Sequence, residues 1–291
     1  MSIQKPGPGL GALDGKTVVI TGASRGIGRA IAIRLGAEGA NVTMIARTAE
    51  PHPKLPGTIH TAAAEAEAAG GHVMPIVADV RDDRAIADAV EATVSRWGGI
   101  DMVVNNAAVI QTQSAEHITM QQFDYMQDIN CRGTVLLSTL CLPALRESAT
   151  AGRNPHILNL SPPLNLASKD IGRFSAYAIS KYSTSVYTIG LAQEVAPYGI
   201  AVNSLWPSTT INTAAVRNQS ALGGAEGVAT SRDPFVMADA ALLVLTRPAA
   251  SYTGNLALDE EVLVADGVTD LDQYRAVPGT LPLTPDLFVD L

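Results

Sequence analysis

Charged side chains, cysteines and long apolar runs are all scarce in this sequence, and each shortage excludes a class of protein. Charged residues make up 16% of the 291 positions and hydrophobic residues 47%, a composition that can bury a core and excludes a disordered chain. The 28 acidic residues outnumber the 20 basic ones, and the net charge of −8 disfavours a broad contact with nucleic acid or an anionic membrane. No run approaches the roughly 18 apolar residues that a membrane span needs, so we expect none.

The two cysteines, Cys131 and Cys141, lie in one segment with helical character. Ten helical residues cover about 15 Å, which is too far for a disulfide between them, so we expect reduced thiols and a cytoplasmic protein. Residues 1–13, MSIQKPGPGLGAL, lack the apolar core of a secretory signal and are predicted to be a flexible leader. We assign no metal ligands in the sequence.

Short apolar runs alternate with longer, Ala-rich segments of helical length over residues 14–260. The runs are continuous rather than alternating, which is typical of strands covered on both faces. This alternation predicts an α/β fold, a single-domain Rossmann-type doubly wound parallel sheet of about seven strands with helices on both faces. The predicted strands are Thr17–Thr21, Val42–Ala46, Val73–Val80, Met102–Asn105, His156–Leu160, Ile200–Leu205 and Asn255–Leu258. The predicted helices include Ile59–Ala69, Asp82–Trp97, Met120–Glu147, Ser175–Ala196 and Pro234–Thr246.

Two segments, Thr48–Thr58 and Ser208–Arg232, do not fit the simple alternation. Ser208–Arg232 follows a predicted strand end, where open α/β sheets bind their ligands, so we expect a mobile substrate lid at about 208–232. The segment 261–291 contains several prolines and acidic residues. It is predicted to be an extension that packs on the domain or on a neighbouring subunit.

A glycine-rich turn, TGASRGIG at 21–28, joins the first predicted strand to a helical pattern. Glycine lets the backbone turn sharply and approach a pyrophosphate closely, and the helix start presents free N–H groups to that anion. The spacing G-x-x-x-G-x-G differs from the commonest dinucleotide fingerprint, and a plain turn is the alternative. The cofactor-binding residues predicted here are Gly22, Ser24, Arg25, Gly26, Ile27 and Gly28.

The end of the second predicted strand bears on the choice of cofactor. An NAD-binding fold usually places Asp or Glu there to bind the ribose 2′-hydroxyl, whereas this strand continues into Arg47. Arg47 and Arg25 suit a 2′-phosphate, because a guanidinium binds phosphate through two parallel hydrogen bonds. We therefore predict NADP(H), with NAD(H) as the alternative if both arginines are ordinary surface residues.

Polar residues also follow the third and fourth predicted strands. Asp79 and Val80 end the third strand, and Asn106 follows the fourth. The nucleotide lies at the carboxyl ends of such strands, so these three residues are predicted to line an adenine pocket. For Asp79 the alternative is an N-cap of the helix that begins near Asp82.

Tyr177 and Lys181 are four residues apart in a segment with helical spacing. Positions i and i+4 share one helix face, so the phenol and the ammonium can face one cavity. A free tyrosine has a pKa of about 10, and a nearby cation lowers it towards the range of an acid/base catalyst. An exposed Tyr/Lys pair is the alternative for this motif taken alone.

Together these motifs resemble the short-chain dehydrogenase/reductase family over about residues 14–260. Further matching marks are NNAA at 105–108, Asn130 within INCRG, and TG at 253–254. The resemblance implies that Tyr177 exchanges a proton with the substrate oxygen and that Lys181 holds the nicotinamide ribose and lowers the tyrosine pKa. It implies that Asn130 holds a water linking Lys181 to solvent, unless Asn130 is a solvent-facing polar residue. A homo-dimer or homo-tetramer is also implied.

Three longer segments, at 52–63, 159–166 and 205–215, resemble one branch of the family, in which a lipid-transfer domain follows the reductase domain. Here we expect the reductase domain alone.

The sequence departs from the family at the serine that orients the substrate carbonyl. The usual spacing before the tyrosine leads to Leu164, and alignment on the fifth strand leads to Pro162, one residue after Ser161. Successive strand side chains point to opposite faces, so Ser161 needs a bulge or a tight turn to reach the substrate. We assign Ser161 as a candidate; the alternatives are a serine bonded to backbone, or no serine in this role.

The predicted function is an NADP(H)-dependent oxidoreductase that interconverts a secondary alcohol and a carbonyl on an apolar, lipid-like substrate. Two alternatives stay open: an NAD(P)-binding regulatory protein with little turnover, and an NAD(H)-linked dehydrogenase.

Overall fold

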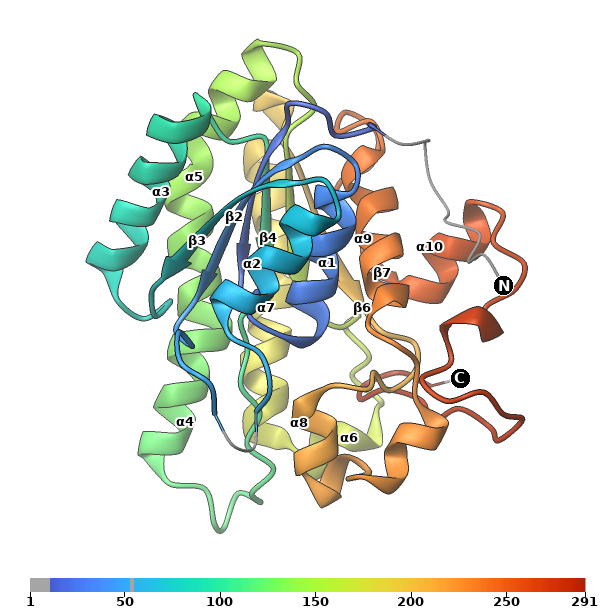
Figure 1. Ribbon diagram of the computed structural model, residues 1–291. Helices are drawn as coiled ribbons and strands as arrows, with labels where there is room; N and C mark the ends of the chain where they lie inside the picture. Colours follow the sequence, from blue (N-terminus) through green and yellow to red (C-terminus); the bar gives the residue numbers. More distant parts are fainter. Residues whose placement is uncertain (1–10, 53–54, 291) are drawn as a thin grey trace.

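The computed structural model describes residues 11–52 and 55–290, and these residues form one sheet of seven strands (Figure 1). Neighbouring strands are all parallel, and their spatial order is β3-β2-β1-β4-β5-β6-β7. The predicted doubly wound parallel sheet is therefore confirmed. The strands are β1 (Thr17–Thr21), β2 (Asn41–Ala46), β3 (His72–Val77), β4 (Met102–Asn105), β5 (His156–Leu160), β6 (Ala201–Trp206) and β7 (Leu256–Leu258).

Helices cover both faces of this sheet. They are α1 (Gly26–Gly36), α2 (Ile59–Ala68), α3 (Asp83–Trp97), α4 (Met120–Gln127), α5 (Gly133–Thr150), α6 (Lys169–Arg173), α7 (Ser175–Val195), α8 (Ala214–Asn218), α9 (Phe235–Thr246) and α10 (Asp259–Ala265). α1, α2 and α9 pack on one face, where Ile31 and Leu242 belong to one buried apolar cluster (Figure 1). α3, α5 and α7 pack on the other face, where Ile86 and Leu191 belong to a second cluster. The strands are continuously apolar because both of their faces are covered in this way.

The strand order reverses between β1 and β4, since the chain first builds outward to β3 and then continues on the other side of β1. In open parallel sheets ligands bind beside the carboxyl ends of the strands at such a reversal. The fold therefore places the binding region next to Thr21, at the end of β1, and next to Asn105, at the end of β4.

The predicted single helix over Met120–Glu147 is wrong, because a π-helical turn at Asp128–Arg132 separates α4 from α5. Such a turn inserts one residue into the helical ladder and rotates the side chains after it, which an apolar pattern does not reveal. Gly133, the residue directly after this turn, lies close to the end of the third strand: a Cβ added to it would stand 3.1 Å from Val80. Asn130 lies within this turn.

Smaller predictions have mixed outcomes. The third strand ends at Val77 rather than at Val80, so Asp79 and Val80 lie beyond the strand. Cys131 and Cys141 are free thiols, as predicted, and burial raises the pKa of Cys141 to about 12. In the described part of the chain, no helix is both long enough and apolar enough to cross a bilayer. Of the predicted leader, residues 1–10 lie outside the described residues.

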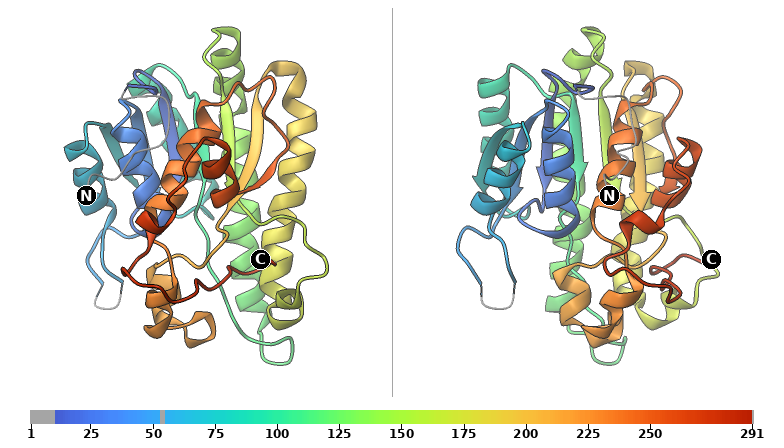
Figure 2. Two further views of the ribbon diagram at one scale, coloured as in Figure 1. Left: turned by 90° about the vertical axis from the view of Figure 1, so that its right-hand side faces the viewer. Right: turned by 45° about the vertical axis from the view of Figure 1, so that its right-hand side comes forward.

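After α10 the chain crosses the carboxyl ends of the strands and ends beside α7 (Figure 2). Tyr274 anchors this crossing: it is 3% exposed, and its hydroxyl donates to the buried Asp239 carboxylate of α9 at 2.7 Å. Farther on, the N–H of Thr210 donates to the carbonyl of Thr284 at 2.9 Å. The C-terminal extension therefore packs on the domain and contacts the segment 208–232.

Candidate active site

The glycine turn between β1 and α1 needs glycine at two positions for packing reasons. Gly22 has φ +66°, and a Cβ there would stand 2.8 Å from the Cα of Ala107. A Cβ on Gly28 would stand 2.3 Å from Nδ2 of Asn106. The turn therefore lies directly against the loop that follows β4, and a larger residue at either position would force the two apart.

Asn106 holds the ends of β1 and β4 together. Its side-chain amide donates to the carbonyls of Thr21 at 2.9 Å and Gly22 at 3.1 Å. The hydroxyl oxygen of Thr21 in turn accepts from the N–H groups of Asn106 and Ala107, both at 3.1 Å. The amide of this predicted cofactor-binding residue thus fixes the shape of the glycine turn.

A cleft of about 360 Å³ lies over this turn. Helix α1 begins there at Gly26 with no side-chain hydrogen bond to its first N–H groups, which leaves them available to an anion. Of the predicted cofactor-binding residues, Gly28 backs onto Asn106, and Tyr177 and Lys181 are not in the described lining of this cleft, while all the others border it. The lining includes Gly22, Ser24, Arg25, Gly26, Ile27, Arg47, Asp79, Val80 and Asn106.

Arg25 and Arg47 place two positive charges at one end of the cleft. Burial lowers the pKa of Arg25, and the charge of Arg47 lowers it further. Arg25 donates to the carbonyl of Gly57 at 3.0 Å, while its Nε is buried with no partner among the described residues. Arg47 is exposed, and its Nη1 donates to the Tyr125 hydroxyl at 2.6 Å. An anion between the two guanidinium groups would relieve their repulsion.

Asp79 borders the cleft but has a strong internal partner. Its carboxylate accepts from Nε and Nη2 of Arg81 at 3.0 and 2.8 Å, and these hydrogen bonds lower the pKa of Asp79. The N-cap of α3 is Asp82, whose carboxylate accepts from the N–H groups of Arg84 and Ala85. The helix-cap alternative for Asp79 is therefore not what the structure shows.

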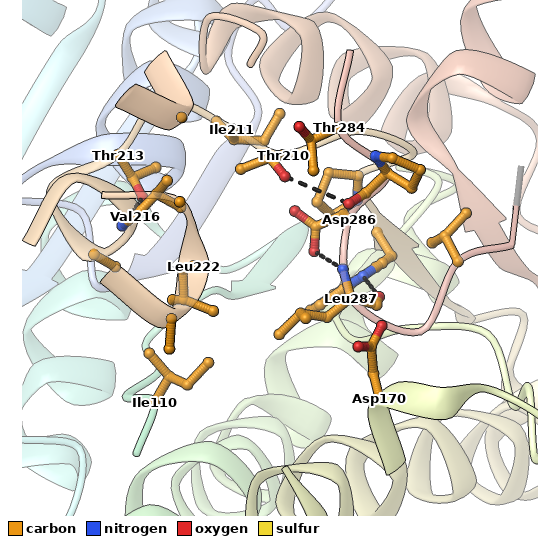
Figure 3. Close-up of a pocket in the computed structure, with 18 of the residues that line it drawn as sticks. Ile110, Asp170, Thr210, Ile211, Thr213, Val216, Leu222, Thr284, Asp286 and Leu287 are labelled. Carbon is orange, nitrogen blue, oxygen red and sulfur yellow. Dashed lines mark hydrogen bonds between the residues drawn. The ribbon is translucent and has the colours of Figure 1, made fainter. Parts of the chain in front are cut away.

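A second cavity, of about 510 Å³, begins where the cleft ends. Ile27, Thr213 and Ala215 line both spaces, so the cleft and the cavity adjoin. Tyr177, in the first turn of α7, lines the cavity (7% exposed), and its hydroxyl has no hydrogen-bond partner among the described residues. Tyr177 therefore lies in a cavity that adjoins the cleft over the glycine turn. Figure 3 shows this cavity and the residues around it.

Lys181 lies one helical turn after Tyr177 and is 3% exposed. Its ammonium donates to the carbonyl of Leu160, at the end of β5, at 2.5 Å and lies 5.1 Å from the centre of the Trp206 ring. Burial lowers the pKa of Lys181 to about 8, against the opposing charge of Asp286.

The expected lowering of the Tyr177 pKa is not found in the protein alone. Burial raises the pKa of Tyr177, and the charge of Asp286 raises it further. The spacing argument considered only the cation on the same helix face. It could not include the loss of hydration or a carboxylate that arrives from a distant part of the chain.

Asn130 connects the loop after β4 to α7. Its side chain accepts from the N–H of Val109 at 2.8 Å and donates to the carbonyl of Val109 and the hydroxyl of Ser180, both at 2.9 Å. Its own carbonyl accepts from Thr184 at 3.0 Å. The residue is 1% exposed, so the solvent-facing alternative is wrong.

Ser161 is fully buried, and its hydroxyl has no partner among the described residues. It is absent from the described lining of the 510 Å³ cavity, which includes its neighbour Leu160 and Tyr177. The backbone-bonded alternative is not observed either. The structure therefore does not bring Ser161 to the cavity that Tyr177 faces.

The sequence analysis missed the cavity wall formed by the tail segment, residues 284–290. Phe288 is fully buried, with its ring centre 6.0 Å from that of Tyr177 and 6.4 Å from that of Trp206. Asp286 lines the cavity beside them. No motif or periodicity marks this segment, so the sequence carries no signal that could have placed it here.

Comparison with known proteins agrees with this geometry. The short chain dehydrogenase family matches residues 16–222. The chain therefore belongs to this family, a class of oxidoreductases that act on CH–OH groups with a nicotinamide cofactor. It is 50% identical over 280 residues to hydroxysteroid dehydrogenase-like protein 2 from Danio rerio, an alignment that covers 96% of this chain and 65% of that protein. The chain thus spans just under two thirds of that relative, and the resemblance to one branch of the family is confirmed.

Solved structures share the fold. A short chain dehydrogenase from Mycobacterium thermoresistibile is 52% identical with a TM-score of 0.87, over 95% of this chain and 96% of that one. More distant structures carry cofactors. One from Mycobacterium paratuberculosis, bound to NAD, is 25% identical with a TM-score of 0.71, and a metagenomic short-chain oxidoreductase in complex with NADP is 26% identical with a TM-score of 0.68. Each covers 85% of this chain and is itself covered to 97%.

Proposed function

We propose that this chain is an NADP(H)-dependent oxidoreductase that interconverts a secondary alcohol and a carbonyl on an apolar, lipid-like substrate. The observation that carries the proposal is the unpartnered Tyr177 hydroxyl, in a cavity that adjoins the cleft over the glycine turn. A phenol without an internal partner at this place is available to a substrate oxygen.

The cofactor would be held by the residues of the cleft and would supply the hydride. Tyr177 would donate its proton to the carbonyl oxygen in reduction, or accept the hydroxyl proton in oxidation. Lys181, whose pKa near 8 keeps it mostly protonated at pH 7, would hold ribose hydroxyls and favour the phenolate through its charge. Asn130 would act indirectly, by fixing Val109 of the cleft lining and the buried Ser180 of α7; the water that the family resemblance assigns to it stays a prediction.

Preference for NADP(H) is supported by the two arginines at the end of the cleft and by the absence of a carboxylate at the end of β2, where Arg47 follows Ala46. The substrate class is supported by the side chains around the cavity. Most are apolar, and they include Ile110, Ile211, Val216, Leu222, Leu287 and Val289. A homo-dimer or homo-tetramer and a cytoplasmic location stay predictions, to be checked by light scattering and by cell fractionation.

The test is NADPH oxidation with a panel of apolar ketones such as acetophenone, cyclohexanone and 2-decanone, followed by absorbance. We expect turnover of at least one member and a loss of about 1,000-fold or more in kcat for Tyr177→Phe. Binding of NADPH, followed by its fluorescence, should be unchanged in this variant. Turnover that survives in Tyr177→Phe would refute the assigned role.

A regulatory protein that binds the dinucleotide with little turnover is the second candidate, and the position of Ser161 outside the cavity lining favours it. In that case NADPH would bind, no carbonyl would be reduced, and Tyr177→Phe would change nothing. The two candidates thus give opposite results in the same assay.

A further inference from the structure

Several polar groups of the described cavity lining have no task in the proposed function; they are threonine hydroxyls, three carboxylates and the exposed side chains of Lys169 and Arg173. A carbonyl bound beside Tyr177 needs a second hydrogen-bond donor to hold its oxygen, and Ser161 is not in the described lining. Among the hydroxyls there, Thr210 approaches the carbonyl of Pro285 at 3.5 Å, Thr230 and Thr284 bond each other at 2.9 Å, and Thr213 accepts from the N–H of Val216 at 3.4 Å. These groups already have partners.

The carboxylates of the cavity lining differ in whether their oxygens have hydrogen-bond partners. Asp170 accepts from Arg173 with one oxygen at 3.0 Å and from the N–H of Phe288 with the other at 3.2 Å. Asp290 is exposed at the rim and accepts from Asn165. Asp286 accepts from the N–H of Leu287 at 2.8 Å through Oδ1, while its Oδ2 has no partner in the described part of the chain. Figure 3 shows the Asp286 carboxylate pointing into the cavity, on the side opposite Val216 and Leu222.

The backbone holds Asp286 in this position. Its N–H donates to the carbonyl of Ser208 at 3.0 Å, and the indole N–H of Trp206 donates to the carbonyl of Leu287 at 2.9 Å. Two residues farther on, the buried ring of Phe288 stacks on Tyr177. A side chain fixed from both sides in this way costs little reorganisation when it binds a substrate.

The charges around Asp286 come from three helices. Lys181 and Tyr177 face it from α7, Asp170 faces it from α6 and Asp259 from α10. Burial raises the pKa of Asp286 to about 7, the two aspartates raise it as well, and Lys181 opposes them. At neutral pH a large share of the molecules therefore carries a protonated carboxyl, which can donate a hydrogen bond to a carbonyl oxygen.

We propose that Asp286 is a further catalytic residue, whose unpartnered carboxyl oxygen hydrogen-bonds the reacting oxygen of the substrate, opposite Tyr177. In reduction the protonated carboxyl donates to the carbonyl oxygen, while Tyr177 transfers the proton that forms the alcohol. In oxidation the same protonated carboxyl donates to the hydroxyl oxygen of the substrate, while the Tyr177 phenolate accepts the hydroxyl proton. Asp286 therefore has the same protonation state before and after a turnover. This assignment rests on the proposed oxidoreductase function.

The experiment compares Asp286→Ala, Asp286→Asn and Ser161→Ala in NADPH-linked reduction of the best carbonyl of the panel. Asp270→Asn, which changes an exposed aspartate of the same extension, is the matched control. We expect Asp286→Ala to lower kcat/KM by about 100-fold, with NADPH binding within about twofold of the wild type in every variant. Asp286→Asn keeps a donor and should lose less, about tenfold.

The pH profile separates this role from a structural one. In the wild type, kcat/KM for reduction should fall as pH rises through about 7, where Asp286 loses its proton. Asp286→Asn should show one decline instead of two, which comes from Lys181 and lies below pH 8, because the Asp286 charge that raises the Lys181 pKa is gone. A protein whose extension was merely disturbed would keep both.

Three results would overturn the proposal. Asp286→Ala could stay within about threefold of the wild type, Asp286→Asn could keep both declines of the pH profile, or Ser161→Ala alone could show the 100-fold loss. A wild type that reduces no member of the panel would overturn the proposed function, and this assignment with it. That outcome is distinct, because in the other three the wild type turns over.

Discussion

The cofactor cleft and the substrate cavity meet at one edge of the sheet, yet the chain builds them in different ways. The cleft comes mainly from short β-turn-α units, in which the residues that bind are close in sequence to the strand that positions them. The cavity joins Tyr177 of α7 to the segment after β6 and to the tail segment 284–290, more than a hundred residues later. The difference teaches that a local motif can specify a binding turn, whereas the pocket for the substrate depends on long-range packing.

The largest effect should come from a substitution that disrupts the packing around the cavity and leaves the cleft unchanged. Phe288→Ala removes a fully buried ring that contacts Tyr177, Tyr182 and Trp206. We expect a loss of about 3–5 kcal/mol in the free energy of unfolding, measured by urea denaturation. Hydrogen exchange should rise at the amides of 284–290, while NADPH affinity should stay within about twofold. Weakened NADPH binding without faster exchange would contradict the separation of the two regions.

The pH dependence of the free energy of unfolding should test a second buried group, Asp259, on the same side of the molecule as the cavity. Asp259 is fully buried, accepts from the N–H of Ser208 at 2.8 Å, and has its pKa raised by burial to about 6. Between about pH 4 and pH 6 the folded protein then binds more protons at this group than the unfolded chain does, so its contribution to stability falls as pH rises.

Asp259→Asn removes this titration. The free energy of unfolding of the wild type minus that of the variant should therefore fall by about 2–3 kcal/mol from pH 4 to pH 6. Denaturation at a series of pH values measures this difference. The buried His156 is present in both proteins, so its contribution to the pH dependence of stability cancels. A difference that rises with pH would mean that Asp259 is ionised at low pH in the folded state.

Breaking the cleft alone should have a somewhat smaller effect. In Gly28→Ala the new Cβ would stand 2.3 Å from Nδ2 of Asn106, and the turn must shift. We expect a cost of about 1–3 kcal/mol, seen as weaker NADPH binding in a fluorescence titration. Gly190→Ala, in α7 with open space around the new Cβ, is the control and should bind NADPH normally. Equal behaviour of the two variants would show that the glycine turn does not hold the cofactor.

The smallest effect should come from one arginine. Arg47→Ala should weaken NADPH binding by about tenfold, or about 1.4 kcal/mol, and leave NADH binding nearly unchanged. Comparing the two dissociation constants checks this and decides between the NADP(H) and NAD(H) hypotheses. Equal weakening for both cofactors would assign Arg47 to the Tyr125 contact instead of to a 2′-phosphate.

The sequence was sufficient to predict most of the scaffold because strands that are apolar on both faces give a local signal. Thr17–Thr21, Met102–Asn105 and His156–Leu160 have the predicted bounds. The π turn at Asp128–Arg132 was not predictable, since one inserted residue leaves the apolar pattern of the helix almost unchanged.

At the site, the glycine turn and the Tyr177–Lys181 spacing identified the residues but not their electrostatics. The pKa of Tyr177 depends on burial and on Asp286, which is 109 residues away in the chain, and neither is visible in a motif of five residues. The same reason applies to Ser161, which directly follows β5 and whose position relative to the cavity depends on how the chain turns after this strand.

The central claim is that the Tyr177 hydroxyl meets the reacting end of a dinucleotide held over the glycine turn. A crystal structure with NADP⁺ bound tests it most directly. We expect the pyrophosphate at the start of α1, the 2′-phosphate between Arg25 and Arg47, and the nicotinamide ring beside Tyr177. A nicotinamide ring bound away from Tyr177, outside the cavity, would contradict the account.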